Sequence, residues 1–192
     1  MNKAKRIIDF SLSVILLILI FPLMSLFGIL IKVSSKGPIL HWSKRVGLNN
    51  KIFYMPKFRT MKTNTPQVAT HLLSNPESHL TPVGNFLRRF SIDELPQLIS
   101  IVQGEMSFIG PRPALHNQKD LIECRTKDGI HFMKPGITGW AQVNGRNAIS
   151  WEEKFKLDVW YVDNKNILLD IKVLILTVYK VILKKDIVPN DK

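Results

Sequence analysis

The chain has 192 residues, which suits one domain with an appendage and is long enough to bury a hydrophobic core. Lys and Arg outnumber Asp and Glu 27 to 15, so the formal net charge is +12. Such an excess favours a polyanionic partner: nucleic acid, an anionic membrane surface or a phosphate-rich substrate. The single cysteine excludes an internal disulfide, and neither it nor the five scattered histidines have the spacing of a zinc site.

An uncharged apolar run occupies residues 10–31. It is long enough to span a bilayer, for which about 20 apolar residues suffice. Pro22, near its middle, removes a backbone donor and predicts a kink. Cationic residues flank the run on both sides, and the positive-inside tendency would keep both flanks on the cytoplasmic face. A re-entrant helix-break-helix that bends at Phe21-Pro22 satisfies this tendency, whereas a single-pass anchor with a tolerated proline is the alternative.

The rest of the chain predicts an α+β fold that is mainly helical with one small β-hairpin. Residues 39–61 predict the hairpin, because two β-prone runs flank the turn signal Gly47-Leu48-Asn49-Asn50. Polar residues dominate 62–82, which predicts a loop with a short helix near 71–73. Helical patterns follow at 83–89, 95–102, 115–126, 150–162 and 166–184, separated by Gly- and Pro-rich loops at 104–113 and 134–147.

The C-terminal stretch 166–185 has apolar residues at helical spacing, but charged residues interrupt it. It is therefore a poor membrane span and predicts an amphipathic helix, lying in the membrane interface or in the core of the domain. The expected organisation is a membrane anchor at 1–36 followed by a single domain at 37–192.

Two adjacent carboxylates, Asp93 and Glu94, follow a pair of arginines. Their place at or just before a predicted helix N-terminus suits a phosphate, because the helix dipole stabilises anions there. A carboxylate beside a phosphate would repel it unless a cation intervened, which predicts a divalent metal such as Mg²⁺ held by both. The alternative is structural, since Ser91-x-x-Glu94 has the spacing of a capping box, although Pro96 places the regular helix nearer Leu95.

Cationic residues are candidates for binding phosphate. Arg112 has a proline on each side, so its planar guanidinium can meet a phosphate at a low entropic cost. A tight turn with a solvated arginine is the alternative. Lys57 and Arg59 lie two residues apart on a predicted strand and would share one face. The Gly-rich loop 135–147 lacks the spacing of the dinucleotide fingerprint or of a P-loop, so its glycines either admit a ligand or make turns.

The motifs resemble those of one known family. The segments KFRTM, SIDELPQL, GEMSFIGPRP, PGITGWAQVNGRN and DVWY occur here in the order found in bacterial sugar transferases, the monotopic polyprenol-phosphate phosphoglycosyl transferases. The resemblance covers nearly the whole chain, and several long motifs in one order are highly specific. The chain is similar to the minimal catalytic form, without the extra transmembrane helices of larger relatives.

The resemblance implies an enzyme that moves a sugar-1-phosphate from a UDP-sugar to undecaprenyl phosphate. Asp93 would attack the β-phosphate, release UMP and form a covalent phosphosugar intermediate, which the lipid phosphate then attacks. Glu94 would help to hold Mg²⁺ or to ready the lipid phosphate. The residues expected to neutralise phosphate oxygens are Lys57, Arg59, Arg88 and Arg112. Arg146 and Asp158 match further motif positions and are expected near the nucleotide or sugar.

The same resemblance implies a re-entrant anchor in the bacterial inner membrane, with the catalytic domain on its cytoplasmic face. Many relatives have Ser-Pro at the break, where this chain has Phe21-Pro22, so that serine hydroxyl is absent. The sequence leaves the oligomeric state open, and a homodimer is compatible with it. The expected sugar is a modified N-acetylhexosamine, used for capsule or another surface polysaccharide or glycan.

The alternatives account for fewer residues. A membrane-tethered basic nucleic-acid-binding protein is permitted by the charge, but it lacks a recognisable motif and gives Asp93-Glu94 no role, so no nucleic-acid partner is expected. A glycosidase is disfavoured, because adjacent carboxylates are poorly placed to flank a glycosidic bond at separations of roughly 5–9.5 Å.

Overall fold

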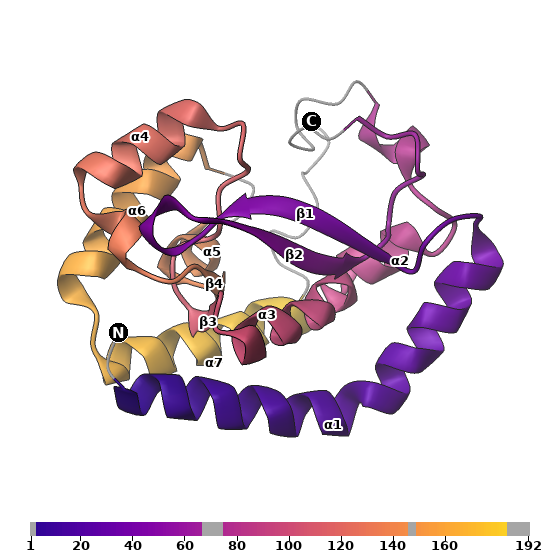
Figure 1. Ribbon diagram of the computed structural model, residues 1–192, viewed down its shortest axis with the longest axis horizontal. Coiled ribbons are helices and arrows are strands. Elements are labelled where there is room, and N and C mark those ends of the chain that lie inside the picture. Colours follow the sequence, from indigo (N-terminus) through magenta and orange to yellow (C-terminus); the bar gives the residue numbers. More distant parts are fainter. Residues whose placement is uncertain (1–2, 67–74, 146–148, 184–192) are drawn as a thin grey trace.

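The computed structural model describes residues 3–66, 75–145 and 149–183. Helices form most of this part of the chain, and an antiparallel hairpin lies across its middle (Figure 1). The hairpin joins β1 (Leu40–Val46) to β2 (Ile52–Phe58) through the 3₁₀ helix η1 (Leu48–Asn50). The predicted α+β class with a small hairpin is confirmed. A parallel pair of short strands, β3 (Ser107–Ile109) and β4 (Gly136–Thr138), was not predicted.

Short helices and turns surround the hairpin and lead to two longer C-terminal helices. In chain order they are η3 (Pro76–His79), α2 (Gly84–Arg89), η4 (Ile92–Gln97), α3 (Leu98–Gln103), α4 (Lys119–Lys127), η5 (Ile130–Phe132), α5 (Trp140–Asn144), α6 (Trp151–Asn164) and α7 (Ile167–Leu183). The short helix predicted near 71–73 falls outside the described residues.

The N-terminal helix α1 (Lys3–Ser34) continues through Pro22 instead of breaking there. It bends along its length (Figure 1), as a proline that lacks a backbone donor requires. The Ser25 hydroxyl donates to the carbonyl of Phe21 (2.9 Å), so a serine hydroxyl bonds a backbone carbonyl next to Pro22 although residue 21 is not a serine. Among the described residues, α1 is the helix long and apolar enough to cross a membrane, and most of its apolar side chains are exposed.

The first turns of α1 are polar and attach to the domain. Lys5 pairs with Asp170 of α7 (2.5 Å), and Asp9 accepts a hydrogen bond from Ser107 of β3 (2.8 Å). Arg6 donates to the carbonyls of Ile101 and Val102 at the end of α3 (2.6 and 2.8 Å), where a cation complements the helix dipole. The N-terminal end of α1 is therefore fixed to three separate elements, α7, β3 and α3.

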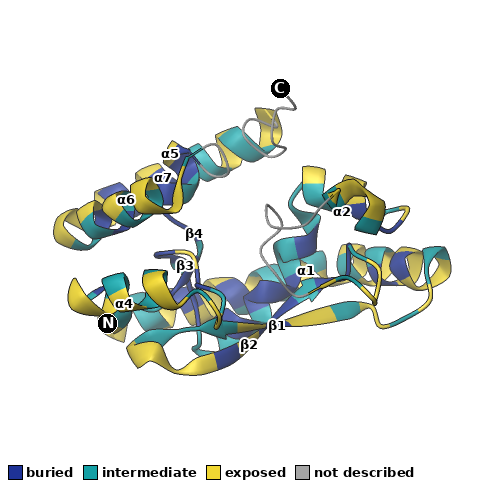
Figure 2. Cartoon of the chain, turned by 90° about the horizontal axis from the view of Figure 1, so that it is seen from above, coloured by how far each residue is buried: buried dark blue, intermediate teal, exposed yellow. Residues whose placement is uncertain are grey.

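Three apolar clusters form the core. The first joins the inner face of the hairpin to α3 and to the middle of α1; its buried members are Phe53, Met55, Leu98, Ile101 and Met106. The second packs β3, α5, α6 and α7 together around Tyr161 and Val173. The third lies beneath the end of α1, where Ile31, Phe58 and Leu87 are buried. The opposite side of α7 is exposed (Figure 2), and large apolar side chains such as Ile171, Ile175 and Val178 lie on it.

Two helix starts differ from the sequence prediction. The helix expected at 115–126 begins at Lys119, because the Gln118 side chain accepts from the amide of Leu115 and closes a turn before it. The capping box forms at Ser150 and Glu153 of α6, not at Ser91 and Glu94. Ser91 instead adopts a left-handed conformation (φ 55°), which leaves the Glu94 carboxylate for other partners.

Candidate active site

Glu94 lies at the centre of a charged cluster formed by three distant parts of the chain. Its Oε1 accepts from Lys57 of β2 at 2.9 Å and from Arg112, in the turn after β3, at 2.6 Å. Although burial opposes ionisation, Arg112 and Lys57 hold the pKa of the Glu94 carboxyl well below its usual range. Glu94 is therefore ionised and held in place by two cations.

Asp93 has a contrasting environment one residue away. It is buried (9% exposed), yet to the described residues its carboxylate makes no hydrogen bond or ion pair. Burial raises the pKa of the Asp93 carboxyl to about 6; Glu94 adds to the rise, while Lys57 and Arg88 oppose it. The site thus holds one carboxylate that two cations bind through Oε1 and one that no described residue engages.

The two other predicted phosphate-binding arginines lie in different places. Arg88, at the end of α2, donates to the Thr60 hydroxyl (2.9 Å), and burial lowers its pKa although the nearby Asp93 and Glu94 oppose the fall. Arg59 follows β2, which ends at Phe58, and its guanidinium donates to the carbonyls of Pro38 and Ser35. The structure therefore brings Arg88 to the carboxylates, whereas Arg59 holds the segment that connects α1 to β1.

Two cations of the site were missed from the sequence. Arg45 of β1 lies on the inner face of the hairpin and donates to the carbonyl of Pro113 (3.1 Å); burial and the nearby Arg112 lower its pKa to about 10. Burial and Arg112 also lower the pKa of Lys154 on α6. Arg45 lies two residues after Ser43 on β1, so the two side chains share one face of the strand. Strand periodicity alone could therefore have marked Arg45 as an inward-facing charge. Lys154 gave no such signal.

The turn that carries Arg112 is fixed through its backbone. Gly110 donates to Thr138 (2.9 Å), and Gly136 donates to Pro111 (3.0 Å), which ties the turn to β4. These strands approach so closely that a Cβ on Gly136 would lie 2.2 Å from the Gly110 nitrogen. The glycines of this loop therefore serve the close approach of another backbone segment.

Asp158, expected near the nucleotide or sugar, instead forms a buried ion pair. It is 2% exposed, and its Oδ2 accepts from Arg125 of α4 at 2.5 Å. Arg125 also donates to the backbone carbonyl of Arg112 (2.8 Å), so Asp158 lies behind the Arg112 turn. Arg146, the other residue expected there, lies outside the described residues.

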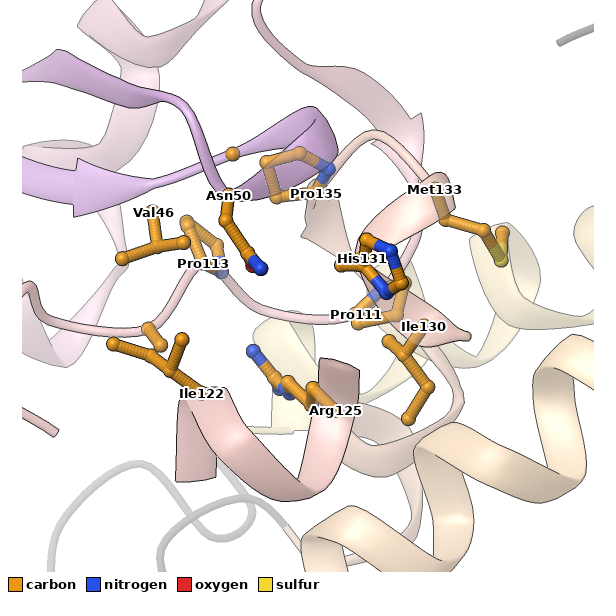
Figure 3. Close-up of a pocket in the computed structure, with 12 residues that line it drawn as sticks. Val46, Asn50, Pro111, Pro113, Ile122, Arg125, Ile130, His131, Met133 and Pro135 are labelled. Atoms are coloured by element: carbon orange, nitrogen blue, oxygen red, sulfur yellow. The ribbon is translucent and has the colours of Figure 1, made fainter. Parts of the chain in front are cut away.

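A hollow lies on the far side of this turn, next to the end of the hairpin (Figure 3). Arg125 extends along it between Ile122 and Ile130, towards the segment with Pro111 and Pro113 (Figure 3). The hollow has a volume of about 30 Å³, which suits one or two water molecules. Arg125 and His131 line this space, and within the described residues the buried Nε of Arg125 and Nδ1 of His131 have no hydrogen-bond partner.

The residues at the site fit a magnesium ion that shares its ligands with substrate and water better than a metal ion held by protein side chains alone. No group of three or more His, Cys, Asp or Glu side chains gathers among the described residues. Mg²⁺ in phosphate-transfer sites is commonly held by one or two carboxylates together with substrate phosphates and water. Asp93 and Glu94 supply that minimum, and Asp93 has the uncommitted oxygens.

Asp93, a buried carboxylate with no hydrogen bond or ion pair to the described residues, lies beside the paired Glu94 and among five cationic side chains. Such a site is of the class that can bind and stabilise phosphates. The comparisons agree: the profile of the bacterial sugar transferase family matches residues 1–184. The chain belongs to this family, as its motifs predicted. Its predicted membrane association agrees with the long apolar α1.

Relatives cover the chain almost completely. An uncharacterized sugar transferase, EpsL of Bacillus subtilis, is 43% identical over 95% of this chain and 89% of its own length. The UDP-glucose:undecaprenyl-phosphate glucose-1-phosphate transferase of Escherichia coli is 39% identical over 92% of this chain. The undecaprenyl-phosphate glucose phosphotransferase of Komagataeibacter xylinus is 37% identical over 95% of it. The matched region spans only 39% and 36% of those two longer relatives.

Proposed function

We propose that this chain transfers a sugar-1-phosphate from a UDP-sugar to undecaprenyl phosphate and releases UMP. The observation that carries the proposal is the contrast between Asp93, which is unpaired towards the described residues, and Glu94, which is held by Lys57 and Arg112. A nucleophile must have a free oxygen lone pair, and a neighbouring charge cluster must stabilise the phosphate that it attacks. The names of the longer relatives support the same reaction for them.

In the first half-reaction, an oxygen of Asp93 attacks the β-phosphorus of the UDP-sugar. A bond forms between this oxygen and phosphorus, the bond from phosphorus to the bridging oxygen breaks, and UMP leaves with the electron pair. Because UMP leaves as a phosphate anion, the step needs no proton donor. Lys57, Arg88 and Arg112 neutralise charge on the phosphate oxygens. A bound Mg²⁺, held by Asp93 and Glu94, would add Lewis-acid stabilisation of the same oxygens.

In the second half-reaction, a phosphate oxygen of undecaprenyl phosphate attacks the phosphorus of the aspartyl-phosphosugar. The Asp93 carboxylate leaves, and the product is a sugar linked to the lipid by a diphosphate. With its pKa raised to about 6, Asp93 is ionised at neutral pH and can act as nucleophile and as leaving group. The paired Glu94 holds Lys57 and Arg112 in place throughout both steps.

The lipid acceptor requires the site to lie at the membrane surface. We assign α1 as a re-entrant helix that enters the cytoplasmic face of the inner membrane, bends near Pro22 and returns. Three features support this topology: the bend, the exposed apolar side chains and the attachment of the first turns of α1 to the domain. The helix α7, bound to the start of α1 through Asp170, exposes large apolar side chains and would rest in the interface.

The test is UMP release by the purified protein from a panel of UDP-sugars with Mg²⁺ and undecaprenyl phosphate. The proposed donor carries a modified N-acetylhexosamine, and UDP-glucose belongs in the panel because two relatives are named for glucose. Asp93→Asn should abolish turnover and covalent labelling by a donor radiolabelled in its sugar. Asp163→Asn, an exposed carboxylate on α6, is the matched control and should keep full activity. Normal turnover by Asp93→Asn would refute the assignment of the nucleophile.

A further inference from the structure

We infer that Asp158 and Arg125 are positioning residues that act on the substrate phosphates through Arg112. This inference deepens the proposed function and rests on it for the role of Arg112 at the phosphates. Neither residue reaches Glu94 itself: Asp158 contacts Arg125, and Arg125 contacts the Arg112 backbone.

The contacts form one continuous chain of atoms. Asp158 Oδ2 accepts from Arg125 Nη2 (2.5 Å), and Arg125 Nη1 donates to the Arg112 carbonyl (2.8 Å). From the same residue, Arg112 Nη2 reaches Glu94 Oε1 (2.6 Å). A planar guanidinium can make the first two contacts at once, because its two terminal nitrogens point in a fixed fork. The orientation of α6 is thereby transmitted to the side chain that meets the phosphates.

Burial sets this ion pair apart from an ordinary surface contact. The Asp158 side chain is 3% exposed and that of Arg125 is 13% exposed, and burial raises the pKa of the Asp158 carboxyl despite the nearby arginine. A buried pair gains little net stability, because the loss of hydration offsets the attraction between the charges. A positional role accounts for a costly pair better than a contribution to stability does.

Two arginines hold the backbone of the Arg112 turn through consecutive carbonyls. Arg45 holds the next carbonyl, that of Pro113, from the hairpin (3.1 Å), while Arg125 holds the Arg112 carbonyl from α4. The adjoining hollow leaves the Arg125 Nε without a partner among the described residues, so Asp158 and the Arg112 carbonyl are the polar groups that fix its guanidinium there. Loss of Asp158 would let Arg125 turn into this space and release the carbonyl.

The first experiment measures hydrogen exchange in the peptide that covers residues 107–115. Asp158→Asn and Arg125→Lys should increase exchange there, since Lys cannot contact both partners at once. Glu123→Gln, which removes an exposed ion pair with Lys127 on the same helix α4, should leave exchange and activity unchanged. Unchanged exchange in this peptide in both test variants would overturn the inference, whatever their activity.

The second experiment is a double-mutant cycle on UMP release. Asp158→Asn should lower kcat/KM roughly 10- to 100-fold, the scale expected when a phosphate-binding group is misplaced by about 1 Å. In the Arg112→Ala background the same substitution should have little further effect, because its route to the phosphates is already gone. An equal loss in both backgrounds would show a general structural role and overturn the inference. If the two variants show increased exchange but the wild-type protein releases no UMP, the contacts are supported while the proposed function is rejected.

Discussion

Replacing Asp93 with asparagine should stabilise the metal-free protein while abolishing turnover. Burial and Glu94 raise the pKa of this carboxyl from 3.8 to about 6, so the fold disfavours its charged form. A rise of about two units corresponds to roughly 3 kcal/mol, at about 1.4 kcal/mol for each unit. Asparagine keeps the shape but carries no charge, so it avoids this cost.

The sign of the effect fixes its dependence on pH. With a raised pKa, the contribution of Asp93 to stability is fully present below pH 3.8 and is lost as the pH rises through 6. The advantage of Asp93→Asn should therefore be about 3 kcal/mol at pH 8 and about half of that at pH 5. For a protein of this size, the gain at pH 8 amounts to a rise in Tm of roughly 6–12 °C.

The assay is thermal unfolding of detergent-purified wild type and Asp93→Asn, with a chelator to remove divalent ions. Asp163→Asn removes an exposed carboxylate from α6 and should leave Tm within about 1 °C at both pH values. An Asp93→Asn protein that is no more stable at pH 8, or whose advantage is the same at pH 5, would refute the electrostatic reasoning. Added Mg²⁺ should reduce the difference by stabilising the wild type.

Three further substitutions test the fold. Ser150→Ala should lower the free energy of unfolding by about 1 kcal/mol, because it removes the capping box of α6; circular dichroism melts measure the loss, and an unchanged melt would mean that the cap does not stabilise the helix. Pro22→Ala should straighten α1, so that a cysteine at Lys3 becomes reachable from the periplasm; unaltered labelling would assign the bend to other residues. Asp9→Ala should cost roughly 1–3 kcal/mol in unfolding experiments by leaving the buried Ser107 hydroxyl without its acceptor, and an unchanged stability would mean that water replaces Asp9.

Local patterns predicted much of the fold. The left-handed asparagines Asn49 and Asn50 form the predicted hairpin turn, and α1, which contains Pro22, is bent. The pairing of β3 with β4 could not be predicted, because each strand has three residues and they are far apart in the chain. Contacts of that kind depend on tertiary packing instead of on local propensity.

The candidate site was predictable in its residue types but less so in their roles. The spacing of Ser91 and Glu94 is equally compatible with a helix cap and with a charge cluster. The left-handed conformation of Ser91, which the sequence does not predict, decides against the cap. The alternation that placed Arg59 beside Lys57 fails, because β2 ends at the residue between them. Asp158 has its partner 33 residues away, a distance at which no local pattern operates.

The ion pair between Lys5 and Asp170 has a consequence for biosynthesis. These residues are 165 positions apart, so at typical rates the ribosome makes Asp170 roughly 10–30 s after Lys5. During that interval the hydrophobic α1 is already made, and the last of the three elements that fix its polar end does not yet exist. A nascent chain therefore exposes the apolar α1 before α7 can bind its first turns, and a chain that terminates before Asp170 would lack this contact.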